Sequence, residues 1–158
     1  MNQHAYTRCV RLAAKAMTRV HVAAYRATRG RIGTTWLGGE VVFLATTGRR
    51  SGRRRIAPLV CIRDDSALAV VASNGGSDRT PDWWLNLQHD PRGEIECSGD
   101  SYPTWGTRAD PESEARLLAR FARTFPQFDG YRRRTTRDVP VVLLRPVTPT
   151  PIKRYASP

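Results

Sequence analysis

The sequence predicts a single, mainly β domain (α+β), in which a small antiparallel barrel carries peripheral helices at its rim. Short apolar segments separated by turn residues recur from residue 41 to residue 146, as the strands of an antiparallel sheet do. The regular alternation of strand and helix that a parallel sheet requires is missing from the sequence. A length of 158 residues fits one hydrophobic core, and 40% hydrophobic with 25% charged residues is ordinary for a globular chain.

Six strands are predicted from apolar runs of strand length. They cover residues 41–46, 56–63, 68–73, 93–97, 102–108 and 139–144. Proline cannot donate to a ladder, so Pro58 places the start of the second strand at a sheet edge or a bulge. Two helices interrupt the strands. One spans residues 80–88, with Thr80 as N-cap and Pro81 in the first helical position, and the other begins at Asp110 and ends before Pro126.

The N-terminal part of the chain has a different pattern. Residues 5–29 predict a basic amphipathic helix with a mostly alanine apolar face. Two interpretations stay open: the helix lies across the domain, or it rests at an interface with anionic lipid. The predicted organisation is therefore a helix at residues 1–30, a glycine-rich linker at 31–40, the barrel at 41–148 and a tail at 149–158.

Several functional classes are not supported by the sequence. The three cysteines form no CxxC pair and the three histidines no HExxH motif, so we expect no metal site and a reducing cytoplasmic environment. No apolar run reaches about 18 residues, the length that spans a membrane. GxGxxG, P-loop and GxSxG motifs are also missing. An enzyme built from these residues would take its reactive atoms from a cofactor.

The most unusual segment is TTGRRSGRRR, residues 46–55, which has five arginines in its last seven positions. It joins the first two predicted strands. On its own, such a turn fits nucleic acid, a lipid surface or one small, highly anionic ligand. The segment ASNGGS at residues 72–77 follows the third strand, and its two glycines let the backbone approach a flat ring closely.

The order of these motifs resembles one known family. LATTGRRSGRRRIAPLV, VVASNGGSDRTPDWWLNLQHDP and FPQFDGYRRRTTRDVPVVLLRP contain the patterns TTGRxSG, ASxGG and PxWxxNL in sequence. The chain is similar here, over residues 44–146, to the deazaflavin-dependent nitroreductases, also called coenzyme F420-dependent quinone reductases. The resemblance implies an antiparallel split β-barrel of the flavin- and deazaflavin-binding type, and coenzyme F420 as the cofactor.

F420 carries a phosphodiester and a tail of glutamates, so the resemblance implies that the arginines bind a small polyanion. The residues implied for the phosphate and tail are Arg49, Arg50, Ser51 and Arg55. Those implied for the deazaflavin and its linker are Ala57, Pro58, Leu59, Ala72, Ser73, Asn74, Gly75, Gly76, Trp83, Trp84 and Asn86. Alternatives stay open: Trp83 and Leu87 have the spacing of core residues, Asn86 suits a local cap, and Arg53 and Arg54 suit solvent.

The resemblance also implies an acceptor pocket. Nitro-reducing relatives line it with tyrosines at positions that here read Val60, Phe125, Phe128 and Tyr131, so one hydroxyl is left. This pocket suits a quinone or an enone better than a nitro compound. We expect Ser73 and Tyr131 to be the catalytic residues, with Tyr131 donating a hydrogen bond to the acceptor.

The expected partner is a small-molecule electron acceptor. A non-catalytic F420 carrier is the alternative function, and a nucleic-acid-binding module is a weaker one that the net charge of +12 suggests. We expect a cytoplasmic protein with no specific nucleic-acid partner. Peripheral contact of residues 5–29 with the inner face of the membrane stays open.

Overall fold

The computed structural model of the chain describes residues 35–36, 39–97, 100–126, 128, 130 and 133–147. The predicted basic helix at 5–29, the predicted tail at 149–158 and Tyr131 lie outside these residues. Within the described chain, no helix is both long enough and apolar enough to cross a membrane.

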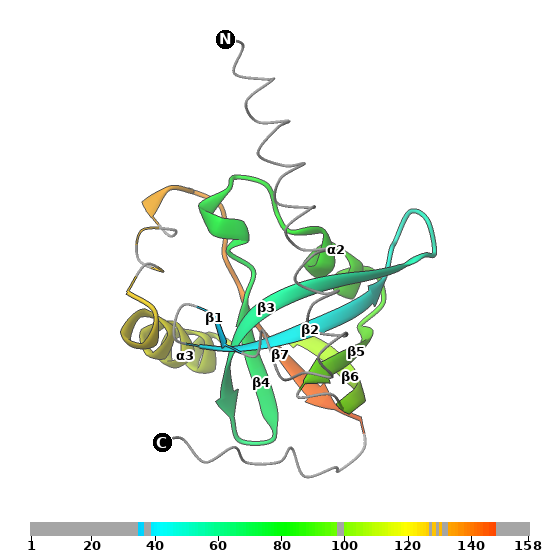
Figure 1. The fold of residues 1–158 in the computed structure, drawn as a ribbon. Helices are drawn as coiled ribbons and strands as arrows, with labels where there is room; N and C mark the ends of the chain where they lie inside the picture. The colour runs from blue at the N-terminus through cyan, green and yellow to red at the C-terminus, as the bar shows by residue number, and fades with distance from the viewer. Residues whose placement is uncertain are drawn as a thin grey trace.

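Six antiparallel strands form a closed barrel (Figure 1). They are β2 (Gly39–Thr47), β3 (Arg54–Asp64), β4 (Ala67–Val71), β5 (Arg92–Cys97), β6 (Asp100–Arg108) and β7 (Val141–Pro146). Their order is β2-β3-β4-β7-β6-β5, and pairing of β5 with β2 closes the barrel. The predicted antiparallel barrel is confirmed, and each of the six predicted strands overlaps an observed one, although the last strand begins and ends two residues later than predicted.

Two strand predictions need correction at their ends. The predicted linker at 31–40 contains a short strand, β1 (Thr35–Trp36), which pairs with the first residues of β2. The predicted third strand ends at Val71 instead of residue 73. The bond from the Ala72 N–H to the Pro140 carbonyl, at 3.0 Å, still continues the ladder to β7, and the extended chain ends at Ser73, which adopts helical backbone angles.

The first half of β3 has a single neighbour in the described sheet. β2 pairs with Arg54–Cys61, whereas β4 pairs with Cys61–Asp64. Pro58 lies in the half that has one neighbour, opposite Phe43 of β2. The predicted edge position of Pro58 is therefore confirmed, since no ladder is broken by its missing N–H.

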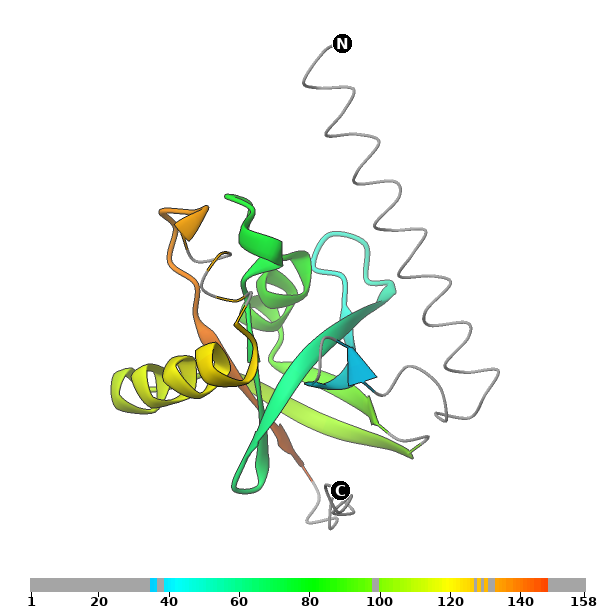
Figure 2. The ribbon, with the colours of Figure 1, turned by 60° about the vertical axis from the view of Figure 1, so that its left-hand side comes forward.

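Two helices lie on different sides of the barrel (Figures 1 and 2). α2 (Asp82–His89) starts after Pro81, which is the N-cap in place of the predicted Thr80, and no side chain caps it. α2 packs so closely on β6 that a Cβ on Gly106 would come within 2.7 Å of a Leu87 methyl carbon. α3 (Pro111–Thr124) has the expected N-cap, because the Asp110 carboxylate accepts from the Ser113 N–H at 2.9 Å.

The side chains of β3 alternate between two hydrophobic clusters. The first, called the barrel core here, fills the barrel interior and its contact with α2. The second, called the α3 cluster, lies between α3 and the outer face of β3, β4 and β7. Leu59 and Cys61 point to the barrel core and Val60 and Ile62 to the α3 cluster. This alternation decides which predicted site residues meet.

Candidate functional site

The arginine turn, residues 48–55, is a tight hairpin connection between β2 and β3. The Gly48 carbonyl accepts from the N–H groups of Ser51 and Gly52, at 3.0 and 2.8 Å, and the Gly48 N–H donates to the Arg53 carbonyl at 2.8 Å. Gly52 has a φ of 63°, which glycine adopts without strain. The two glycines thus close the turn and leave its arginine side chains at the surface.

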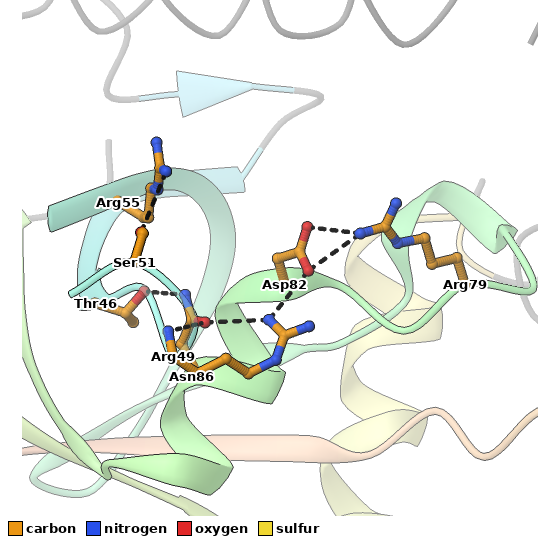
Figure 3. Close-up of polar contacts among 7 residues, drawn as sticks. All are labelled: Thr46, Arg49, Ser51, Arg55, Arg79, Asp82 and Asn86. Atoms are coloured by element: carbon orange, nitrogen blue, oxygen red, sulfur yellow. Dashed lines mark hydrogen bonds and ion pairs between the residues drawn. The ribbon is translucent and has the colours of Figure 1, made fainter. Parts of the chain in front are cut away.

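One residue of α2 fixes this turn to the barrel (Figure 3). The Asn86 side chain accepts from the Arg49 peptide N–H at 3.1 Å and from the Arg49 guanidinium at 3.2 Å. Its amide nitrogen donates to the Thr46 hydroxyl at 3.0 Å. Asn86 is 3% exposed, so each of these bonds replaces a bond to water that burial removes. Asn86 is thus a partner of the Arg49 backbone 37 positions away and not a local cap, and its contact with the cofactor stays a prediction.

Asp82, at the start of α2, forms ion pairs with arginines from two directions. Its carboxylate accepts from Arg49 at 3.2 Å and from Arg79 at 2.9 Å. Partial burial raises the pKa of Asp82, but the hydrogen bonds and charges of Arg49 and Arg79 outweigh it and leave that pKa below its ordinary value. Arg49 is therefore already engaged, and any anion bound at the turn meets a partly neutralised Arg49.

The remaining arginines of the turn differ in their surroundings. Arg50 and Arg53 are exposed, and their guanidinium groups have no partner among the described residues. Arg55 makes one long contact, 3.4 Å from the Ser51 hydroxyl. It faces Thr46 across the ladder and therefore lies on the α2 side of β3. Arg54 lies on the opposite face, where it pairs with Glu94 of β5.

The segment Ala72–Ser77 forms a loop in which Asn74, Gly75 and Gly76 all have positive φ. Its shape is set by Arg137, which sequence analysis missed. The Arg137 guanidinium donates to the carbonyls of Ala72, Ser73 and Ser77, at 2.8, 2.8 and 2.9 Å. Arg137 lies in the segment FPQFDGYRRRTTRDVPVVLLRP, but no local pattern predicts its contacts, because its partners lie 60–65 positions away.

The residues implied for the deazaflavin do meet in part. Ala57 and Leu59 are half-buried and pack against the barrel core, to which Ala72, Trp83 and Trp84 belong. The two tryptophan rings lie 6.4 Å apart and are 9% and 8% exposed. Trp83 and Leu87 face the core, as their spacing predicts. Within the set, Ala57 and Leu59 are the partly exposed residues, packed against a core that contains the other three, and Pro58 lies on the other face of β3.

The residues implied for the acceptor pocket gather elsewhere. Val60 packs against the α3 cluster, which includes Phe125 and Phe128. Both phenylalanine rings contact Phe121, with centroids 5.7 and 5.8 Å apart, and are at most 5% exposed. In the structure they are core residues on the other face of β3 from Leu59, and a role in the acceptor pocket stays a prediction. So does the role of Tyr131, which is not among the described residues.

Fold and turn together define a split-barrel protein with an arginine-rich hairpin between β2 and β3. The sequence model of the family described as "F420H(2)-dependent quinone reductase" matches residues 17–146. An F420H(2)-dependent quinone reductase of Mycobacterium tuberculosis (strain H37Rv) is 34% identical over 132 residues, which is 81% of this chain and 89% of that protein. This chain therefore belongs to the F420H(2)-dependent quinone reductase family.

Comparison with solved structures also supports the split-barrel fold. The structure of an F420H2-dependent reductase, FDR-A, is 25% identical, with a TM-score of 0.60 over 66% of this chain and 93% of its own. The heme storage protein HutZ of Vibrio cholerae is 16% identical, with a TM-score of 0.52 over 68% of this chain and 82% of its own. The second likeness concerns the split-barrel architecture alone.

Family membership implies an F420-dependent reductase, and the residues present fit that cofactor. The free guanidinium groups of Arg50 and Arg53, with Arg55, match a phosphodiester and a polyglutamate tail. The half-buried face formed by Ala57 and Leu59 beside Trp84 matches a flat ring. Among the described residues, no three His, Cys, Asp or Glu side chains gather as a metal ion would require.

Proposed function

We propose that this protein transfers a hydride from reduced F420 to a quinone, an enone or another conjugated or nitro acceptor. The observation that carries the proposal is the arginine turn: among the described residues, the guanidinium groups of Arg50 and Arg53 have no partner and that of Arg55 has one long contact, and the half-buried Ala57 and Leu59 follow on β3. A relative that is 34% identical is named as a quinone reductase of this kind, which supports the acceptor class.

When bound, the deazaflavin supplies the hydride, and the chain supplies binding and orientation. Arg50 and Arg55 hold the anionic tail through charge-assisted hydrogen bonds. Asn86 and Thr46 keep the turn in register with α2, so that the arginines and the apolar face stay in a fixed relation. The two buried tryptophans exclude water from one side of the apolar face.

Two residues are assigned to the chemical step. Ser73 contacts the ring system through its hydroxyl or its N–H and orients it for transfer. Replacement by valine then lowers turnover more than F420 affinity. The Tyr131 phenol donates a hydrogen bond to the acceptor oxygen as negative charge develops there. Both assignments derive from the family resemblance and the position of each residue in the sequence.

The direct test mixes purified protein with reduced F420 and a panel of quinones, enones and nitroaromatics, while the deazaflavin absorbance is followed. We expect oxidation of the cofactor with quinones and enones, and slower oxidation with nitroaromatics. Tight binding of F420 without turnover on any acceptor would favour the alternative function, a non-catalytic F420 carrier. Failure to bind F420 would reject both functions.

We also propose a cytoplasmic location with peripheral contact between residues 5–29 and anionic lipid, since quinones reside in membranes. Each basic residue near an anionic surface adds about 1 kcal/mol of attraction. Replacing Arg8, Arg11 and Arg19 by glutamine should therefore release the protein from anionic vesicles in a flotation experiment, with turnover on a water-soluble quinone unchanged. Equal flotation of the variant and the native protein would contradict the contact.

A further inference from the structure

A single arginine of the segment before β7, Arg137, bonds both ends of the loop at residues 72–77. The Nη2 atom of Arg137 donates to two consecutive carbonyls, those of Ala72 and Ser73, both at 2.8 Å. Its Nε atom reaches the Ser77 carbonyl at 2.9 Å. One guanidinium thus holds both ends of the loop, which a residue with a single polar atom could not do.

This contact orients the peptide groups of the loop. In a trans peptide the carbonyl and the N–H point in opposite directions. Because the carbonyls of Ala72 and Ser73 point to Arg137, the N–H groups of Ser73 and Asn74 point away from it. Neither N–H has a hydrogen-bond partner among the described residues. The loop therefore presents two donors beside Ala72, a member of the barrel core.

Arg137 is itself held by a rigid support. The neighbouring Asp138 carboxylate accepts from Arg108 at 3.1 Å, and Arg108 also donates to Glu114 in the first turn of α3 at 2.9 Å. Glu114 in turn accepts from the Val141 N–H at 3.2 Å, at the start of β7. The chain around Arg137 is thus tied to β6, α3 and β7, so the loop is fixed relative to the barrel.

We propose that Arg137 is a positioning residue of the cofactor site, which holds residues 72–77 so that the Ser73 and Asn74 N–H groups can bond an oxygen of the cofactor ring. The inference rests on the proposed function, since it takes F420 as the ligand. Arg137 acts through the loop and does not touch the ligand.

The test compares three full-length variants. Arg137→Met keeps the apolar stem and removes all donors, and Arg137→Lys restores the charge with a head too small to span three carbonyls. Arg145→Met is the control, because Arg145 is an exposed arginine of β7 that makes one described side-chain bond, to Thr107. Circular dichroism and thermal unfolding report whether each variant folds.

Two measurements report on the loop and on cofactor binding without depending on turnover. Hydrogen exchange of the amides at 73–77 is measured in the free protein, and the Kd for oxidised F420 is measured by equilibrium dialysis. For Arg137→Met we expect at least tenfold faster exchange in this loop and at least tenfold weaker binding, with Arg137→Lys in between. Arg145→Met should match the native protein in both.

Each result decides the inference. Native exchange and native Kd in Arg137→Met would overturn it while leaving the proposed function intact, provided that the native protein binds F420. A native protein that does not bind F420 would overturn both. If Arg137→Met does not fold, Arg137→Lys carries the test. A Kd of Arg137→Lys for F420 within twofold of the native value would then overturn the positioning role of Arg137.

Discussion

Two groups of arginines near opposite ends of β3 differ in how fully carboxylates pair them among the described residues. In the arginine turn, Arg50 and Arg53 have no described partner and Arg55 has one long contact. At the other end of β3, Arg63, Arg116 and Arg120 are each paired with a carboxylate. Arg116 and Arg120 of α3 both bind the Asp64 carboxylate, at 2.7 and 3.0 Å, and Arg63 binds Glu40 at 2.6 Å.

The two groups of arginines differ in the number of carboxylates within reach and in the geometry of their contacts. Arg116 and Arg120 are one helical turn apart, so both reach a carboxylate that is only 13% exposed, and Arg120 also donates to the Arg63 carbonyl at 2.8 Å. The arginine turn has Asp82 on one side and Glu94 on the other, too few for five guanidinium groups. Unpaired arginines on a rigid turn are available for a ligand, whereas paired ones join a strand to a helix.

The largest expected effect is on cofactor affinity. Replacing Arg50 and Arg55 together by glutamine removes two charge-assisted contacts, each worth about 1.5–3 kcal/mol, and should weaken F420 binding at least 100-fold. FMN, which has one phosphate and no glutamate tail, should bind the native protein much more weakly than F420 does. Binding is measured by equilibrium dialysis, with the double variant Arg116→Gln and Arg120→Gln as control.

The control should bind F420 like the native protein, because its arginines are already paired with Asp64. Loss of affinity in the control equal to that in the turn variant would mean that overall positive charge, not the free groups of the turn, attracts the cofactor. Equal affinity of the native protein for FMN and F420 would likewise show that the arginine turn does not recognise the glutamate tail.

A smaller effect is expected for Tyr131→Phe, which removes only a hydroxyl. Tyr131 precedes another arginine run, in which Arg133 and Arg134 are exposed. If the phenol stabilises charge on the acceptor, turnover on a quinone should fall at least tenfold, about 1.4 kcal/mol, with an unchanged Kd for F420. Unchanged turnover in steady-state kinetics would leave Tyr131 a packing residue, and the proton would come from water.

Asp64→Asn should affect stability without affecting the cofactor. Hydrogen bonds from Arg116 lower the pKa of Asp64, despite the opposing effect of burial, and the charges of Arg116 and Arg120 add to this. A carboxylate with a lowered folded-state pKa stabilises the fold above its ordinary pKa, and this contribution disappears as the pH falls through the folded-state value. We expect a loss of about 1 kcal/mol at pH 7.

Urea unfolding at two pH values checks this sign. The difference between native protein and Asp64→Asn should shrink as the pH falls below the ordinary Asp range, because the native carboxylate is then protonated too. A difference that stays constant from pH 7 into strong acid would show that the lost packing, and not the ion pairs, accounts for the change.

Sequence reasoning placed the strands well because their apolar runs and the turns between them are local signals. It placed the end of the third strand too late, at Ser73, because Ser73 adopts helical backbone angles in a loop whose carbonyls, those of Ala72 and Ser73, accept from the distant Arg137. The motifs indicate candidate site residues, but they do not indicate which distant residues hold these candidates in place. Asp82 pairs with Arg49 across 33 positions and Arg137 with Ala72 across 65, and such contacts have no periodic signature.

A last comparison separates neighbouring arginines of one strand, Arg54 and Arg55. Arg54 and Arg55 carry the same charge, but strand alternation places Arg55 opposite Thr46, on the α2 side, and Arg54 on the outer face with Glu94. Arg55→Gln should weaken F420 binding about tenfold. Arg54→Gln should change F420 binding less than threefold. Both variants lose the same long-range attraction to the cofactor, but only Arg55→Gln also loses a direct contact with it. Equal losses in the two variants, measured by equilibrium dialysis at 0.15 M salt, would show that the turn attracts the tail by charge alone. A loss confined to Arg55 would show that the face of β3 toward α2 is where the cofactor lies.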